Sequence, residues 1–417
     1  MTDIEEKLTR VLATAADQVP RRTPYELSEG VGARYRRRRA RPAALLAAVA
    51  VLVVAGGAGA AVRALGARAV PEPAVNATGT PGPTPRPEPE PAEKLPPRIE
   101  RVWPRALHKI PAKLPDGREY HPQLLLDDRT LLVMTGVSDG TRQFLWTYDL
   151  ASGRPTRIAE IPPTRGSAIF ADGVAAGGGN IVWWASYKKP GGQRVARIWT
   201  VPTGGGRPRQ VTDVQLENVM KQGHIRALAV VGSDVVFSRE SGGVYRVPLR
   251  GGEPRAVPGT EGRHLLRWPW VGRHTKHADL SKLVVFSELF NVETRKRRDA
   301  LVRPGESLVR CGVDLCYGMM PPEGELPRRF VRDRDGSRER ALPRNVQLGD
   351  DPGLERFFKL IGQKGVALYD MVTGRSADLG IRPTKDGSIG VPDGGLDRLM
   401  TYRIGDRVHV VDLAAIK

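Results

Sequence analysis

The sequence has few of the residues that usually carry catalysis or bind metals. Its 417 residues include two cysteines and seven histidines, and no G-x-S-x-G nucleophile motif occurs. The segment 387–390 (GSIG) resembles that motif only superficially, because it follows an Asp-Gly turn. Only His274 and His277 are close enough to suggest a metal pair, with Asp279 as a third ligand, and we favour a solvated loop there. The sequence therefore predicts no catalytic residue, no metal and no cofactor.

Long helical stretches are also scarce after residue 99. Runs rich in β-branched and aromatic residues, such as 124–137, 144–150 and 180–187, alternate with Gly, Pro and Asp-Gly turns. A helix-length pattern is confined to residues 354–361. Residues 99–417 are therefore predicted to be all-β, and these roughly 320 residues are enough to bury a core.

Internal repeats indicate the architecture of this β-rich part. Residues 198–211 (IWTVPTGGGRPRQV) align with residues 244–257 (VYRVPLRGGEPRAV) at an offset of 46, and residues 145–158 and 368–379 carry further copies. Each copy predicts a strand, a turn with glycine at its exit and a second strand. A weaker copy lies at Gly336, the 84-residue gap between Gly252 and Gly336 leaves room for one further unit near Thr294, and a seventh is implied by residues 412–414, which match residues 149–151. The turns then recur at intervals of about 38 to 53 residues, which is typical of four-stranded propeller blades.

The phrase VYRVPLRGGEPRAVPG resembles the TolB-type propeller repeat. The resemblance covers most of residues 105–417 and implies a TolB-like β-propeller over residues 99–417 in an extracytoplasmic setting. We expect seven blades. Residues 107–110 would supply the outer strand that is missing after the C-terminal repeat, and this exchange would close the ring. TolB-like repeats occur both in binding modules and in peptidase propellers, so the resemblance implies no activity.

One long apolar run, residues 42–62, contains no charged or strongly polar side chain. As a helix it would be about 31 Å long, against roughly 30 Å for the hydrocarbon core of a bilayer. Six arginines precede it and only two follow closely, which predicts a cytoplasmic N-terminus and an extracytoplasmic outer part. These six are Arg34, Arg36, Arg37, Arg38, Arg39 and Arg41. We expect a retained single-pass anchor in the cell membrane. The alternative is a cleaved signal peptide, for which residues 58–60 match a cleavage site.

Residues 1–41 form the predicted cytoplasmic head. Residues 2–19 show the spacing of an amphipathic helix, with Thr2 and Glu5 as a capping box. Because one helix cannot bury its apolar stripe alone, lipid, a second copy or a cytoplasmic protein must cover it. The head resembles the inner segments of actinobacterial single-pass proteins, some of which regulate sigma factors. It contains no His or Cys, so the zinc-type anti-sigma motif is absent.

Residues 63–98 form a Pro-rich linker between the predicted span and the β-rich part. Ten prolines occur in residues 70–98. Such a segment favours polyproline II, at about 3.1 Å per residue, and would act as a semi-rigid spacer of up to roughly 80 Å. That length suits the thickness of a bacterial wall.

The chain is strongly basic, with a formal net charge of +19, of which +14 falls in residues 99–417. Of the 65 basic residues, 51 are arginine and 14 are lysine. One interpretation is the codon usage of a GC-rich genome; the other is attraction to anionic wall polymers or phospholipid head groups. The charged loop at residues 293–298 has the same two interpretations, solvation or an anionic ligand. Nucleic acid is not expected as a partner outside the cell.

Cysteine and tryptophan pairs complete the candidate sites. Cys311 and Cys316 are the only cysteines, and CGVDLC fits a hairpin with one cysteine on each strand. We predict a disulfide between them, with two buried thiols as the alternative. The tryptophans of residues 183–184 and 268–270 are predicted to wedge between blades, and stacking on sugars is the alternative.

These observations predict a membrane-tethered extracytoplasmic propeller that acts as a binding, sensing or scaffold module at the cell envelope. The expected partner of its face is an envelope protein or an anionic wall polymer. One alternative is a propeller hydrolase or lyase acting on wall sugars or peptides. The other is a regulator of a cytoplasmic sigma factor, acting through residues 2–19.

Overall fold

The computed structural model describes most of the chain after residue 93. The described ranges are residues 94–136, 142–162, 172–189, 191–215, 225–274, 284–320, 327–348, 351–395 and 397–417. The chain divides into two compact units, Met1–Lys94 and Leu95–Lys417. The amphipathic helix at 2–19, the span at 42–62 and the six flanking arginines lie outside the described residues. No helix in the described ranges is long and apolar enough to cross a membrane.

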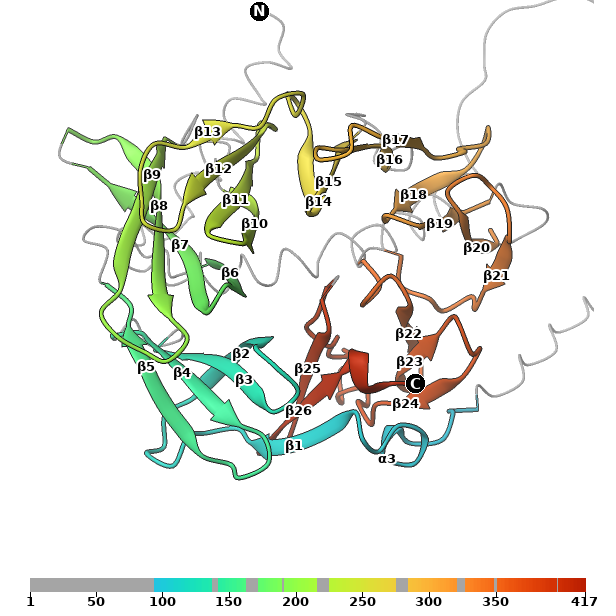
Figure 1. Cartoon of the computed structure of the whole chain (residues 1–417). Coiled ribbons are helices and arrows are strands. Elements are labelled where there is room, and N and C mark those ends of the chain that lie inside the picture. Colours follow the sequence, from blue (N-terminus) through green and yellow to red (C-terminus); the bar gives the residue numbers. More distant parts are fainter. Residues whose placement is uncertain are drawn as a thin grey trace, which may run out of the picture. The chain divides into compact units, whose positions relative to one another are not determined.

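The second unit is built from antiparallel β-sheets, as the alternating apolar pattern predicts. Its described helices are two short ones, α3 (Ile99–Val102) and the 3-10 helix η3 (Leu413–Ala415). The sheets follow one another around a centre in the order of the chain (Figure 1). The helical pattern noted at residues 354–361 was wrong. That segment enters strand β22, because its apolar side chains pack into a sheet core on both faces.

Three sheets have four strands each, and strands that follow one another along the chain pair antiparallel. The first contains β2 (Tyr120–Leu125), β3 (Thr130–Thr135), β4 (Phe144–Asp149) and β5 (Pro155–Glu160). The second contains β6 (Asp172–Gly177), β7 (Asn180–Lys188), β8 (Arg194–Pro202) and β9 (Arg209–Gln215). The third contains β10 (Ile225–Val231), β11 (Asp234–Arg239), β12 (Val244–Pro248) and β13 (Arg255–Ala256).

An eight-stranded sheet follows, and it consists of two antiparallel groups. The first group is β14 (His264–Arg267), β15 (Trp270–His274), β16 (Val285–Asn291) and β17 (Arg297–Asp299). The second is β18 (Ser307–Cys311), β19 (Leu315–Met319), β20 (Arg329–Asp333) and β21 (Arg340–Leu342). A single parallel residue pair, Val285 with Arg310, joins the groups.

Two three-stranded sheets complete the unit. One contains β22 (Phe357–Gly362), β23 (Gly365–Asp370) and β24 (Ser376–Asp378), and the other contains β25 (Leu399–Ile404), β26 (Arg407–Asp412) and β1 (Leu107–Pro111). Each has a rudimentary fourth strand in the form of one bridge. Val346 pairs with Leu360 beside β22, and Asp393 pairs with Thr401 beside β25.

The predicted exchange between the chain ends is present. β1 pairs antiparallel with β26, from Leu107 opposite Val411 to Pro111 opposite Arg407, and it forms the outer edge of that sheet. Pro97 and Arg98, the last two residues of the predicted linker, already contact β24: the Pro97 oxygen accepts from the Asp378 amide at 2.9 Å. Ile99 and Ile416 are buried in one core cluster, so both ends of this unit are fixed in the same place.

The core lies between neighbouring sheets. Trp183 and Trp184 follow one another on β7, and their side chains point to opposite faces because strands alternate. Trp183 is 0% exposed and packs with residues of the β2–β5 sheet, whereas Trp184 is 4% exposed and packs with residues of the β10–β13 sheet. The predicted wedge role is confirmed for this pair, and its rings are not available to stack on sugars.

Candidate functional site

One turn recurs after the third strand of several sheets. After β4, the Asp149 carboxylate accepts from the amides of Ala151 and Ser152, at 3.0 and 2.6 Å. After β23, Asp370 accepts in the same way from Val372, at 3.0 Å. After β16, the side-chain oxygen of Asn291 accepts from the amides of Glu293 and Thr294, at 3.0 and 2.9 Å. This last turn confirms the repeat that was expected near Thr294.

The recurring turn places a basic residue at a fixed position. The Asp149 amide donates to the Arg154 oxygen at 3.0 Å, and the Asp370 amide donates to the Arg375 oxygen at 2.9 Å. The Asn291 amide donates to the Lys296 oxygen at 2.8 Å. In the aligned repeats, Arg207 occupies the position of Arg154. Four sheets therefore present a cation at an equivalent place.

The turns after β8 and β12 contain glycine pairs that dock on the preceding sheet. The Gly206 amide donates to the Ile158 oxygen of β5 at 3.2 Å. Gly205 has φ +95°, and a Cβ there would lie 3.2 Å from the same oxygen. Gly251, with φ +104°, lies in the same way against the Val211 oxygen of β9. Only glycine allows this backbone conformation together with this close approach, which explains why the repeat carries it.

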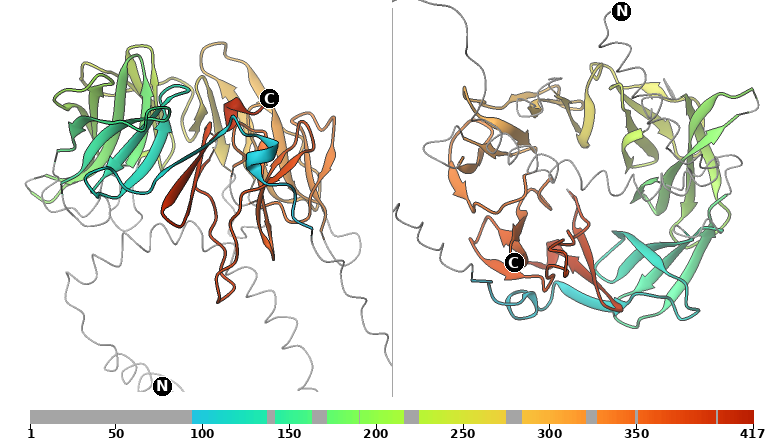
Figure 2. Two further views of the ribbon diagram at one scale, coloured as in Figure 1. Left: turned by 90° about the horizontal axis from the view of Figure 1, so that it is seen from below. Right: turned by 180° about the vertical axis from the view of Figure 1, so that it is seen from behind.

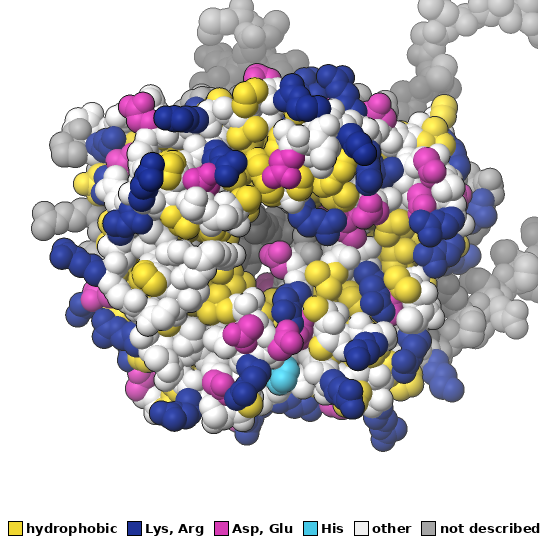
Figure 3. Space-filling view, in the orientation of Figure 1, with side chains coloured by type: hydrophobic (Ala, Val, Ile, Leu, Met, Phe, Trp, Pro, Cys, Tyr) yellow, Lys and Arg dark blue, Asp and Glu magenta, His cyan; other side chains and the backbone are white. Residues whose placement is uncertain are grey.

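All these turns lie on one face of the unit. Because neighbouring strands are antiparallel, the turn after the first strand and the turn after the third strand lie at the same end of a sheet. η3 follows β26, the third strand of its sheet, and the side view shows it at this end (Figure 2, left). Figure 3 looks onto this face: it is hollowed at its centre, and Lys and Arg side chains are spread around its rim.

Several cations on this face have no carboxylate partner. In the described ranges, no ion pair involves the exposed residues Arg154, Arg207, Arg250, Arg255 or Lys296. Arginines elsewhere in the unit are commonly paired. For example, Arg197 binds Asp213 through two hydrogen bonds of 2.7 and 3.0 Å. Among the described residues, exposed cations without a carboxylate partner also lie at the other end of the strands, for example Arg344 and Lys364, so it is the repeated position of the turn cations that distinguishes them.

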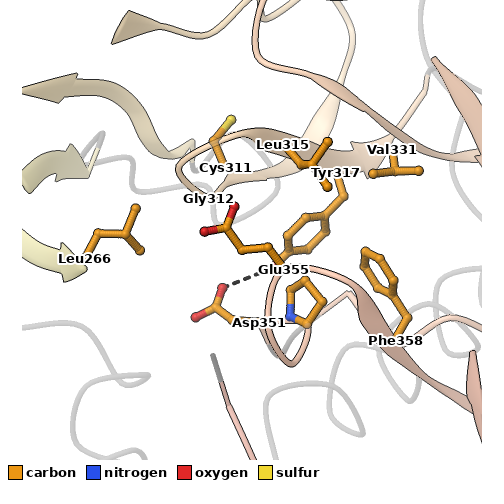
Figure 4. Close-up of a pocket in the computed structure, with 10 residues that line it drawn as sticks. Leu266, Cys311, Gly312, Leu315, Tyr317, Val331, Asp351, Glu355 and Phe358 are labelled. Atoms are coloured by element: carbon orange, nitrogen blue, oxygen red, sulfur yellow. Dashed lines mark hydrogen bonds between the residues drawn. The ribbon is translucent and has the colours of Figure 1, made fainter. Parts of the chain in front are cut away.

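A small cavity lies on the same face, between the β14–β21 sheet and the loop before β22 (Figure 4). Its lining residues are Leu266, Cys311, Gly312, Leu315, Tyr317, Val331, Asp351, Pro352, Glu355 and Phe358. Asp351 accepts from the Tyr317 hydroxyl at 2.9 Å and from Arg310 Nε at 3.2 Å. Glu355 accepts from the Asp314 amide at 3.2 Å. Both carboxylates are thus already engaged within the protein.

The size and electrostatics of this cavity are those of a packing interface between sheets rather than of a substrate-binding site. Its volume is about 10 Å³, roughly the space that one water molecule requires. Burial, together with the negative charge of Asp351, raises the pKa of Tyr317 well above its usual value, so its hydroxyl stays a proton donor. Gly312 lies directly against the Glu355 carboxylate, so a larger residue there would displace that side chain.

The cysteines are joined as predicted. Cys311 on β18 and Cys316 on β19 lie directly opposite each other in the hairpin and form a disulfide with a Cα–Cα distance of 4.0 Å. Both are buried in one apolar cluster with Val309 and Phe330. The alternative of two free thiols was wrong. Cys311 of this disulfide also lines the small cavity, and the disulfide is a structural link.

The remaining candidates do not gather into a reactive site. Ser388 donates to the Asp386 carboxylate inside a turn, at 2.7 Å, as the Asp-Gly interpretation predicts. His277 lies outside the described residues. Among those that are described, no group of three His, Cys, Asp or Glu residues is placed to hold a metal ion.

The loop at 293–298 and the second tryptophan pair form a polar cluster around β14–β17. Trp268 Nε1 donates to Glu293 at 2.8 Å. The Arg298 guanidinium lies 4.7 Å above the Trp270 ring and also binds Asp314 at 3.0 Å. Neither tryptophan is fully buried, so the wedge prediction holds less completely for these two than for the pair on β7.

Sequence reasoning missed two features. It treated the turn glycines as repeats but did not recognise the basic residue beside them, although Arg154, Arg207 and Arg375 each directly follow a turn glycine. It also gave no signal for the cavity formed by Tyr317, Asp351 and Glu355, because these residues come together only through packing between sheets.

No protein-family model matches the sequence, and no curated protein sequence is similar to it. Solved structures do resemble this chain. YCF48 bound to a D1 peptide is 11% identical, with 73% of this chain and 96% of that chain covered and a TM-score of 0.44. The β-propeller domain of the Trilobed protease from Pyrococcus furiosus is 12% identical, with 66% and 84% covered and a TM-score of 0.39.

A prolyl endopeptidase structure is also 12% identical, with 77% of this chain covered and a TM-score of 0.45. This chain spans half (50%) of the length of that enzyme. At these identities the likeness concerns the fold alone. These neighbours are β-propeller proteins. The all-β architecture of this chain is shown by its own antiparallel sheets.

Proposed function

We propose that this chain is a membrane-tethered, extracytoplasmic, TolB-like β-propeller that acts as a binding, sensing or scaffold module at the cell envelope. Residues 42–62 anchor it in the membrane with the N-terminus in the cytoplasm, residues 63–98 space it from the surface, and residues 2–19 contact a cytoplasmic protein. Its partner on the outer face is an envelope protein or an anionic wall polymer.

Seven blades account best for the strand groups. The three four-stranded sheets, the two groups of the eight-stranded sheet and the two three-stranded sheets give seven antiparallel groups. Each three-stranded sheet gains its inner strand from the bridges at Val346 and Asp393. The pairing of β1 with β26 completes the last blade, which supports a closed ring without open edges.

The observation that carries the binding function is the set of exposed, unpaired cations on equivalent turns of one face. Charged loops on one side of a rigid ring of sheets are a common arrangement for recognition. Clustered positive charges also draw partners of the opposite sign and raise their rate of association. The cavity on this face is too small for a substrate and has its carboxylates engaged, so it adds no support for catalysis.

Full-length protein in lipid nanodiscs, incubated with isolated cell-envelope fractions, tests the function. We expect retention of an envelope component that is released by salt, with no covalent change in it. Release of a cleaved sugar or peptide product would contradict a binding role. The tether is tested by single cysteines placed at residue 10 and in the linker of intact cells. Only the linker site should react with an impermeant reagent, and labelling at residue 10 would contradict the orientation.

A further inference from the structure

We propose that the turns of four consecutive sheets form one binding arc for a linear polyanion, whose anionic groups are phosphodiesters or carboxylates spaced along a chain. This inference rests on the proposed binding function and deepens it by assigning the site. The cation arc is defined here as Arg154, Arg207, Arg250 and Lys296, one exposed residue from each of the turns after β4, β8, β12 and β16.

Direct contacts hold the second, third and fourth turns of the arc against the sheet that precedes each of them. The Gly206 amide binds the Ile158 oxygen, and the Gly252 amide binds the Val211 oxygen at 3.4 Å. In the fourth turn, Arg295 donates to the oxygen of Pro258, which follows β13, at 3.4 Å. Successive cations of the arc are therefore carried by turns that are fixed to one another through the sheets. A rigid row of this kind loses little conformational freedom when it binds an extended ligand.

The arc itself is positive, and one exposed carboxylate, Glu253, lies in the turn that carries Arg250. None of its four members is in an ion pair with another described residue. Of the nearby carboxylates, Asp149 caps its own turn and Glu293 accepts from the Trp268 indole. Arg209, at the base of the second turn, donates to the Leu249 oxygen at 2.6 Å and thus braces the third turn. It is a positioning residue and is left out of the arc.

A polymer fits this geometry better than a small anion does. Each arc residue is exposed and lies on a turn rather than in an enclosed pocket, and single exposed charge pairs contribute at most about 1 kcal/mol. Once one anionic group of a polymer is bound, its neighbours are held at high effective concentration near the next cations, so several weak contacts add up to a higher overall affinity. Phosphate and carboxylate groups are attracted by the positive charge of arginine and lysine alike, so the charge of the arc sets the chemistry of the ligand.

A flat anionic membrane fits less well, because carboxylates share this face. Asp128, in the turn between β2 and β3, has 87% of its side chain exposed. Glu253 is exposed in the turn that also carries Arg250. A bilayer pressed against the face would bring all of these groups against its own negative charge, whereas a narrow polymer that follows the arc meets fewer of them.

The test measures binding of long-chain inorganic polyphosphate and of poly-glutamate to the full-length protein in zwitterionic nanodiscs, at several salt concentrations. The arc variant is R154Q/R207Q/R250Q/K296Q. The control variant, K113Q/R344Q/K364Q/K385Q, removes four exposed charges that lie in loops at the other end of the strands. We expect the arc variant to lose about tenfold or more in affinity for at least one probe and to show a shallower salt dependence, and the control to stay within about twofold of the parent.

Three results would overturn the arc. Equal losses in both variants would mean that only net charge matters. Tighter binding of phosphatidylglycerol vesicles than of either polymer, lost in the arc variant, would assign the face to a membrane. Absence of polymer binding, with an envelope component still retained by the parent protein, would refute the arc and leave the proposed function standing.

Unfolding curves of both variants must match the curve of the parent protein. If the arc variant is unstable, the variant R154K/R207K/R250K, which keeps every charge, provides a second measurement. If this lysine variant binds the polymer within about threefold of the parent protein, the result supports the charge arc. If it loses about tenfold in affinity, as expected of the glutamine variant, the result refutes the arc.

Discussion

Arg356 and Asp370 form a two-point ion pair that joins the start of β22 to the end of β23, with N–O distances of 2.7 and 2.6 Å. The same pair recurs between Arg398 and Asp412, again 14 residues apart, at the start of β25 and the end of β26. In both cases the carboxylate also caps the turn that follows the strand. One repeated side-chain pair thus fixes the direction in which the chain leaves the sheet.

Replacing Asp370 by Asn should lower the free energy of unfolding by about 3 kcal/mol, because the Asp370 side chain is buried and Arg356 would lose its partner. Urea denaturation measures the change. Asp406 has 92% of its side chain exposed, so Asp406→Asn is the matched control and should change stability by less than about 0.5 kcal/mol. A similar loss in both variants would contradict a special role for the buried pair.

Mild acid should weaken the closure of the ring through His409. This side chain on β26 is buried and stacks on Tyr402, with ring centroids 4.8 Å apart. Burial lowers its pKa, and the charge of Lys109 on β1 lowers it further, against the opposing effect of Glu100. His409 therefore binds a proton more readily in the unfolded chain than in the folded protein. The stability that the neutral side chain contributes is fully present above about pH 6.5 and is lost as the pH falls toward the lower pKa of the folded state.

His409→Phe keeps the stacked ring and removes the titration. We expect its urea midpoint to change less between pH 7 and pH 5 than the midpoint of the parent protein. Parallel pH profiles in the two proteins would show that other groups, such as the carboxylates, account for the loss.

Gly205→Ala should destabilise the protein by about 1 kcal/mol or more, because φ +95° is unfavourable for alanine and the new methyl group would press on the Ile158 oxygen. The neighbouring Gly204 has open space at its Cβ position, and its backbone does not adopt the left-handed conformation. Gly204→Ala is therefore the control and should be close to neutral. If the two substitutions shifted the melting temperature equally, docking of the glycine turn on the previous sheet would not be the cause.

The Cys311–Cys316 disulfide should contribute about 2 kcal/mol, since it closes a short loop within one hairpin. C311S/C316S should melt at a lower temperature and keep its fold. Alkylation of the denatured, unreduced parent protein followed by mass measurement should find no free thiol. Full alkylation without reductant would refute the link.

Removal of β1 should destabilise the whole ring rather than one edge. A chain that begins at residue 116 lacks the strand paired with β26 and the buried side chains of Ile99 and Trp103. We expect it to melt well below a chain that begins at residue 94, measured by circular dichroism. Equal melting temperatures would mean that the pairing of the chain ends contributes little.

The sequence by itself determined the features that depend on local interactions. Alternating apolar residues and glycine turns predicted the strands, because each turn is fixed by hydrogen bonds among a few neighbouring residues, as Asp149 and Gly153 show. The hairpin register of Cys311 and Cys316 also followed from spacing alone. The partner of β26 was predictable because residues 107–110 repeat the pattern of an outer strand.

Only the tertiary structure decided which distant residues meet. Lys296 carries no recognisable repeat around it, since Arg295 takes the place of glycine with φ +61°, and only the hydrogen bond from Asn291 reveals that it is equivalent to Arg154. The cavity of Tyr317, Asp351 and Glu355 arises from packing between separate groups of strands. The physical reason is that turn geometry is set by short-range hydrogen bonds, whereas the arrangement of charges on a face depends on how whole sheets pack around their shared cores.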